Sequence, residues 1–252
     1  MVNRERMVAE FLELVRIDSL TFKEREMAQC LKEKLNNMGL IVEEDDAGVK
    51  IGGNSGNLIC KIEGDKNVPA VLLMAHMDTV TPGIGKKPVV DGNYIRTDGT
   101  TILGGDDAAG IECILEAIRV LKEDSLPHGD IYVVFTVAEE GGLWGAKNLD
   151  VSKINAKYAF VMDDGGKIGH VAVNAPAQNK INIIVTGKAA HAGMEPEKGI
   201  SAIQIASAAI SNMRLGRIDE ETTANIGIIS GGQATNIICD RVEIKAEARS
   251  RD

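Results

Sequence analysis

Two absences narrow the range of protein classes to which this 252-residue chain can belong. No apolar run is long enough to cross a bilayer, which takes about 20 residues. No stretch combines basic residues with interleaved aromatics, and the formal net charge of −9 would repel nucleic acid and anionic membranes. We therefore expect a soluble globular protein with no nucleic-acid partner and no membrane partner.

Cysteine is also scarce, and its spacing gives no pairs. The four cysteines are widely separated and each lies in an apolar run, where a free thiol behaves as a small buried hydrophobe: Cys30, Cys60, Cys113 and Cys239. Residues 1–16 have the apolar spacing of an amphipathic helix rather than of an export signal. Reduced thiols without an export signal predict a cytoplasmic location.

Strand and helix patterns alternate over the first 178 residues. We expect strands at 57–62, 70–75, 130–137 and 157–162. We expect helices at 3–16, 23–38 and 107–121. Residues 81–101, rich in Pro, Gly, Asp and Thr, are expected to form a long surface loop. The alternation predicts an α/β fold with a mostly parallel sheet flanked by helices.

The pattern changes after about residue 178. Strands are expected at 180–186, 223–230 and 241–248, with one helix at 199–213. This βαββ order is that of an incomplete ferredoxin-like α+β unit, without its second helix and fourth strand. We therefore predict two domains, at 1–178 and 179–252.

Four short motifs contain a histidine or acidic residues directly after the predicted end of an apolar strand. They are His76-Met-Asp-Thr-Val, Gly104-Gly-Asp-Asp-Ala-Ala-Gly, Glu139-Glu-Gly and Asp163-Asp-Gly-Gly. Ligands of open α/β sheets bind beyond the carboxyl ends of the strands, so these side chains should converge. Nitrogen and oxygen donors of this kind suit zinc or a similar divalent ion. The pattern points to metal-assisted hydrolysis.

Taken singly, each motif also fits a structural role. His76 fits a buried core histidine, and Asp107 fits a helix N-cap. Asp163 and Asp164 fit a tight turn, and either could be a ligand; we favour Asp163 because it directly ends the strand. Asp106 has no such ready structural explanation, and its two oxygens could bridge two metal ions.

Together the motifs resemble the zinc-dependent co-catalytic exopeptidase superfamily, and most closely its peptidase T-like tripeptide aminopeptidases. The specific pieces are His-x-Asp-Thr-Val, Gly-x-Asp-Asp-x-Ala-Gly and Glu-Glu-Gly, and the likeness runs over essentially the whole chain. It implies that 1–178 is a catalytic metal-binding domain and that 179–252 is a lid or dimerisation domain. It also implies a short-peptide substrate, and a homodimer formed through the lid at full length.

The resemblance further implies two divalent metal ions, with zinc as the expected metal. Their ligands would be His76, Asp106, Glu140 and Asp163. The first ion would take His76, Asp106 and Asp163, and the second would take Asp106 and Glu140, so that Asp106 bridges.

Other positions carry implied catalytic and substrate roles. Asp78 would orient His76, and Glu139 would be the general base that activates water. His191 matches a lid histidine that stabilises the oxyanion. Asn236 and Arg249 match lid positions that contact substrate.

Two departures from the family pattern qualify these expectations. Ala108 stands where relatives often carry lysine. Relatives also continue further and supply a last histidine to the second zinc, whereas no histidine follows His191 here. We therefore expect the chain to correspond to the N-terminal two-thirds of such an enzyme. In this length it should hold the second zinc poorly and be a weak or inactive hydrolase.

Two alternatives stay open. One is a related N-acyl amino acid amidohydrolase or carboxypeptidase of the same architecture. The other is a non-catalytic metal-binding or oligomerisation module, or an inactive fragment. A binding module has no need of a general base beside a metal ligand, so Glu139 argues for the enzyme.

Overall fold

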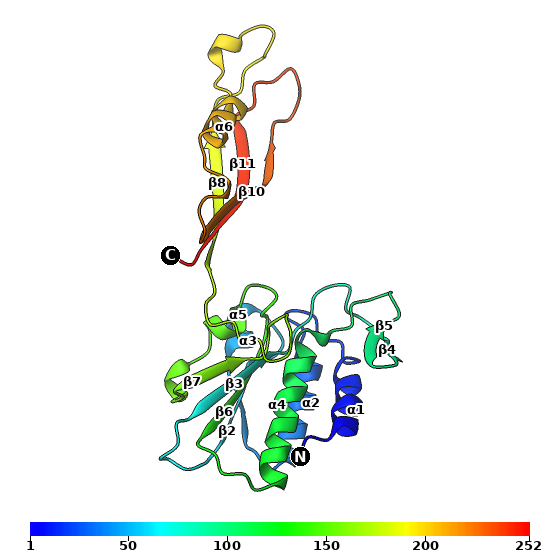
Figure 1. Cartoon of the computed structure of the whole chain (residues 1–252). Helices are drawn as coiled ribbons and strands as arrows, with labels where there is room; N and C mark the ends of the chain where they lie inside the picture. Colours follow the sequence, from blue (N-terminus) through cyan, green and yellow to red (C-terminus); the bar gives the residue numbers. More distant parts are fainter. The chain divides into compact units, whose positions relative to one another are not determined.

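The computed structural model describes all 252 residues, which divide into two compact units, Met1–Gly166 and Lys167–Asp252 (Figure 1). Each unit contains its own sheet and its own apolar core. The domain boundary predicted after residue 178 lies just inside strand β8 (Ala177–Thr186). No helix of the chain is both long and apolar enough to pass through a membrane.

The first unit is built on a five-stranded sheet with the order β1-β2-β6-β3-β7. The strands are β1 (Val42–Glu44), β2 (Leu58–Ile62), β3 (Val71–His76), β6 (Ile131–Thr136) and β7 (Tyr158–Val161). β3 pairs in parallel with both β6 and β7, whereas β1 and β2 add two antiparallel pairings. The predicted α/β class is confirmed. Three of the four motifs follow the mutually parallel strands β3, β6 and β7. The strand expected before Asp106 and Asp107 is absent, and irregular chain leads there into the start of a helix.

Helices cover one face of this sheet, and the sequence explains why. The long ones are α1 (Arg4–Leu14), α2 (Arg25–Asn37) and α4 (Gly105–Glu123). In Figure 1, α2 and α4 lie beside the sheet, and α1 packs against α4. In β6, Ile131, Val133 and Phe135 join the core beneath these helices, and the alternate Tyr132 and Val134 join a smaller core on the other face. A strand covered on both faces must be apolar throughout, as this one is.

The segment predicted as a long loop contains a β-hairpin. β4 (Pro88–Asp91) and β5 (Tyr94–Thr97) pair across Gly92 and Asn93, and Gly92 has a φ of 58°. A two-residue turn with positive φ is a hairpin signal, which the polar composition of the whole segment obscured. The loop prediction was therefore wrong over these eight strand residues.

The remaining elements of the first unit are short. They are α3 (Ala47–Ile51), α5 (Trp144–Lys147) and the 3₁₀ turn η1 (Val151–Lys153).

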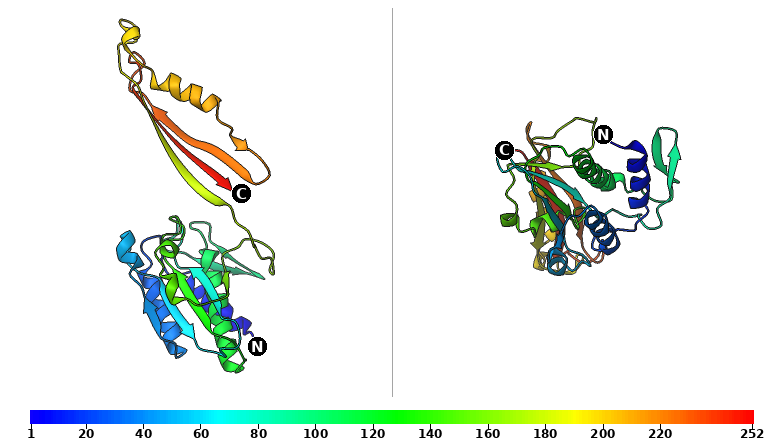
Figure 2. Two further views of the ribbon diagram at one scale, coloured as in Figure 1. Left: turned by 90° about the vertical axis from the view of Figure 1, so that its left-hand side faces the viewer. Right: turned by 90° about the horizontal axis from the view of Figure 1, so that it is seen from below.

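The second unit is a four-stranded antiparallel sheet with one helix. Its order is β8-β11-β10-β9, with β9 (Gly216–Arg217), β10 (Thr222–Gly231) and β11 (Arg241–Ser250). The 3₁₀ turn η2 (Pro196–Lys198) precedes α6 (Ala202–Ser211), which lies along one face of the sheet (Figure 2). Ala202 and Ala206 share a core with Val242 and Ile244. The expected βαββ order is present, with the short β9 added at an edge.

Candidate metal centre and active site

His76 ends β3 with its imidazole almost wholly buried, 2% exposed. Its Nε2 lies 2.8 Å from Asp106 Oδ1, and its Nδ1 lies 3.5 Å from Asp78 Oδ1. Burial alone would lower the pKa of His76, but the interactions with the two nearby carboxylates outweigh burial and raise it to about 10. This strand end is therefore a place where the protein favours positive charge.

Asp78 is fully buried and joins the end of β3 to the turn after β6. Its Oδ1 accepts from Glu139 N at 2.8 Å, and its Oδ2 accepts from Glu140 N at 3.2 Å and from Thr21 Oγ1 at 2.7 Å. Burial alone would raise the pKa of Asp78, but the nearby His76 and the hydrogen bonds from Thr21 and Glu139 more than offset burial and lower the pKa. The predicted partner of His76 thus also fixes the Glu139–Glu140 turn.

Adjacent aspartates at the start of α4 have separate surroundings. Asp107 is buried, and its Oδ1 accepts from Gly110 N at 3.0 Å, as expected for an N-cap. Its Oδ2 accepts from His76 N at 3.2 Å, and burial raises its pKa to about 7. Asp106, by contrast, has a side chain that is 70% exposed and is directed at His76 Nε2.

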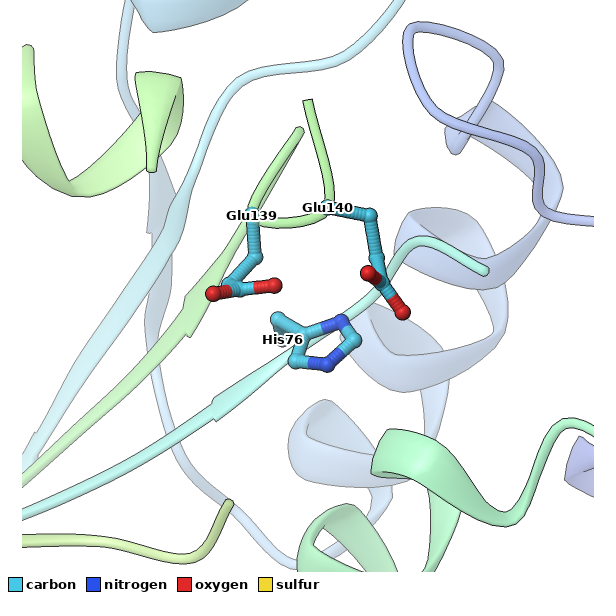
Figure 3. A group of neighbouring side chains, drawn as sticks. All are labelled: His76, Glu139 and Glu140. Carbon is cyan, nitrogen blue, oxygen red and sulfur yellow. The ribbon is translucent and has the colours of Figure 1, made fainter. Parts of the chain in front are cut away.

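Glu139 and Glu140 follow β6 and point toward the imidazole of His76 (Figure 3). Donor atoms of these three residues lie within 4.8 Å of one another, and so do those of His76, Asp106 and Asp163. Burial raises the pKa of Glu139, Glu140 and Asp163, and repulsion from neighbouring carboxylates adds to the rise. The structure thus brings together all the predicted ligands and the predicted base of the first unit.

This donor set fits a divalent cation. One imidazole nitrogen and several carboxylate oxygens form the group, and such donors bind zinc and similar ions. A cation among them would replace mutual repulsion by attraction. Asp106 lies near enough to Glu140 for its charge to raise the pKa of Glu140, which suits a pair of ligands to one ion.

A role for the connection between α1 and α2, which contacts Met77, Asp78 and Thr79, was not predicted from the sequence. Ser19 Oγ donates to Met77 O at 2.7 Å, and Thr79 N donates to Ser19 O at 2.7 Å. Thr21 is bonded to Asp78, as described above. The signal that could have found this segment is a set of short hydroxyl residues where the chain turns between two helices.

The predicted lid residues all lie in the second unit. Ala192 N donates to Asn236 O at 2.9 Å, and His191 forms an isolated β-bridge with Ile237, so the two loops are neighbours. Arg249 lies near the far end of β11, opposite Gln178 of β8, and its Nε donates to Glu247 at 3.1 Å. The unit therefore brings the first two residues together and holds Arg249 apart from them.

Comparison with known proteins gives the family. A peptidase dimerisation domain model matches residues 178–252, and the model of peptidase family M28 matches residues 57–190. The crystal structure of aminopeptidase PepT from Bacillus cereus is 53% identical, with a TM-score of 0.94 over 100% of this chain and 68% of that one. A tripeptidase structure from Staphylococcus aureus is 47% identical, with a TM-score of 0.95 over the same shares. The chain belongs to the peptidase T-like family.

The chain is also similar, at lower identity, to a curated peptidase T sequence. Peptidase T of Aliivibrio fischeri is 34% identical over 245 residues, which span 80% of this chain and 58% of that protein. The chain thus spans between about half and two-thirds of the length of these relatives. The family resemblance predicted from the four motifs is confirmed, and by family the chain is a peptidase and so a hydrolase. The roles of the individual site residues stay predictions.

Proposed function

We propose that this protein is a zinc-dependent aminopeptidase that hydrolyses tripeptides and similarly short peptides. The observation that carries the proposal is the convergence of His76 with four carboxylates, which come from the ends of parallel strands and from the start of α4. The printed descriptions of its relatives, an aminopeptidase and a tripeptidase, support the substrate class.

His76, Asp106 and Asp163 would hold one metal ion, and Asp106 and Glu140 would hold a second. When bound, such ions lower the pKa of a water to about 7 and polarise a scissile carbonyl. The shared position of Asp106 beside His76, with Glu140 within range of its charge, supports a bridging role.

Glu139 would take a proton from the attacking water and pass it to the leaving amine. Burial raises the pKa of its carboxyl group, which brings the group closer to the near-neutral range that suits a proton acceptor. Its backbone N–H is bonded to the buried Asp78, so the turn that carries it is fixed. A carboxylate on a fixed backbone can keep its position through repeated proton transfers.

Three residues of the second unit would act on the substrate. His191 would donate to the developing oxyanion, and Asn236 and Arg249 would contact the peptide. The neighbouring loops of His191 and Asn236 support a shared task for these two residues. The match to a peptidase dimerisation domain supports a homodimer formed through this unit. Location in the cytoplasm stays a prediction.

The test combines metal analysis with a substrate panel. Purified protein should contain zinc and should release the N-terminal residue of tripeptides faster than it cleaves N-acyl amino acids or C-terminal residues. Glu139→Gln should cut kcat by about 10²- to 10⁴-fold, the usual contribution of a general base, while metal content is kept. The matched control is Glu63→Gln, an exposed glutamate of the same unit. Preference for N-acyl amino acids would favour the amidohydrolase alternative, and a protein that binds no metal would contradict the proposal.

A further inference from the structure

A buried glutamate that is not among the proposed metal ligands contacts the turn after β6, which carries Glu139 and Glu140. Glu24 directly precedes α2, and it is 0% exposed. It occupies the N-cap position, yet its side chain makes no capping hydrogen bond to the helix. Burying a carboxyl group is costly, and helix capping does not offset the cost here. The hydrogen bonds that stabilise this carboxyl group are therefore made to residues outside α2.

Glu24 bonds to backbone rather than to a cation. Its Oε1 accepts from Phe22 N at 2.8 Å and from Ala138 N at 3.0 Å, while Oε2 has no hydrogen-bond partner. Phe22 and Ala138 both have positive φ, 70° and 49°, which is uncommon for residues other than glycine. One buried oxygen atom thus holds the N–H groups of two strained residues, 116 positions apart in the sequence. Such conformations persist only where the surroundings impose them.

The bond to Ala138 completes a series along the turn after β6. Three consecutive N–H groups donate to buried carboxylates: Ala138 to Glu24, then Glu139 and Glu140 to Asp78. The left-handed conformation of Ala138 redirects the chain just before the two glutamates, which point toward His76 (Figure 3). If Ala138 relaxed, the direction of both carboxylates would change.

The same connection packs against the far side of the turn. A Cβ placed on Gly141 would lie 3.0 Å from the Thr21 methyl group and 3.6 Å from the Phe22 ring. Thr21 also donates to Asp78 Oδ2. The connection from Thr21 to Glu24 therefore supports residues 138–141 by contacts at both ends.

We propose that Glu24 is a positioning residue, whose single oxygen Oε1 sets the backbone of Ala138 and thereby aims Glu139 and Glu140 at the metal site. The inference rests on the proposed hydrolase function. Glu24 touches neither substrate nor metal and acts through the turn alone.

The experiment compares Glu24→Ala with Glu24→Gln. Glutamine keeps an acceptor at Oε1, and it loses nothing at the position of Oε2, which has no partner. Alanine leaves two buried N–H groups unpaired. A shift of about 1 Å can cost about 10²-fold in rate, so kcat for a tripeptide should fall by about 10- to 100-fold in Glu24→Ala with little change in KM. The kcat of Glu24→Gln for the same tripeptide should stay within about threefold of the kcat of the unchanged protein.

A second readout is independent of activity. Hydrogen–deuterium exchange of the metal-free protein should show faster exchange of amides 138–140 in Glu24→Ala and normal protection in Glu24→Gln. The matched control is Glu116→Ala, because Glu116 is also buried and accepts a backbone N–H, from Asn3 at 2.6 Å, but in the contact between α1 and α4. It should lower stability without faster exchange at 138–140. If Glu24→Ala does not fold, Glu24→Asp serves, since it keeps a carboxyl group on a shorter side chain.

The outcomes separate the two claims. Unaltered exchange at 138–140 in Glu24→Ala, or in Glu24→Asp where that variant is used, would overturn the inference, and so would a loss of kcat in Glu24→Gln as large as in Glu24→Ala. If the unchanged protein hydrolyses no peptide, the proposed function fails, and the exchange data alone still decide whether Glu24 positions the turn.

Discussion

Replacing Asp78 with asparagine should weaken both metal binding and folding. The carboxylate accepts three hydrogen bonds in a fully buried position, from Glu139 N, Glu140 N and Thr21 Oγ1. Asparagine keeps one acceptor oxygen and turns an N–H donor toward the partners of the other. At least one buried N–H then loses its acceptor, which costs about 1–3 kcal/mol of the free energy of unfolding.

The same substitution removes the anion that faces His76 Nδ1 at 3.5 Å. Loss of a group that orients a metal-binding histidine typically costs about 10- to 100-fold in metal affinity. We therefore expect Asp78→Asn to bind zinc about 10- to 100-fold more weakly in chelator competition, and to lose about 1–3 kcal/mol in urea unfolding of the metal-free protein.

The matched control is Asp45→Asn. Asp45 also accepts backbone N–H groups in the first unit, from Ala47 at 2.9 Å and Asn57 at 2.8 Å, but it lies outside the metal-ligand groups. It should lose comparable stability and keep its zinc affinity. Equal zinc affinities for Asp78→Asn and the unchanged protein would refute the reasoning, as would an equal loss of affinity in the control.

Two further predictions concern protons and metal. Burial and the neighbouring Glu10 raise the pKa of Glu112, whose two oxygens have no hydrogen-bond partner, so the folded state holds a proton there that the unfolded state releases. Stability from this group is present at low pH and lost as the pH rises above its ordinary value of about 4.3, so Glu112→Gln should gain stability over the unchanged protein between about pH 5 and 9. Equal pH slopes in urea unfolding would contradict this. Removing metal with a chelator should lower Tm, because carboxylate repulsion returns, and zinc at about 100 times its Kd should restore about 2.7 kcal/mol. A Tm unaffected by chelator and zinc would count against a metal at this site.

The positions of most of the ligands could be predicted because they follow apolar strands, whereas Asp106 follows irregular chain at the start of α4. His76, Glu139 and Asp163 stand at or just beyond strand ends, and the parallel pairing of β3 with β6 and β7 brings those ends to one edge of the sheet. The local sequence pattern was enough to predict these strand ends, because the alternation of apolar residues and the end of an apolar run are both visible in consecutive residues.

The support behind the site could not be predicted in this way. Thr21 is 57 residues from Asp78, and Glu24 is 114 residues from Ala138, and no local periodicity relates such pairs. Likewise the antiparallel edge strand β1 has only three residues, too few for a period to be recognised. Contacts of this kind depend on how distant segments pack, which propensity does not encode.

The double attachment of Asp78 has a consequence for reading mutant kinetics. Because one carboxylate faces His76 and also holds the backbone of Glu139, a displacement of the metal ligand is transmitted to the proton acceptor. A substitution that displaces either His76 or Glu139 is therefore expected to displace the other as well. Rate losses from substitutions at His76 and Glu139 should not add, and a double-mutant cycle between them should show a coupling energy that becomes smaller when Asp78 is also replaced.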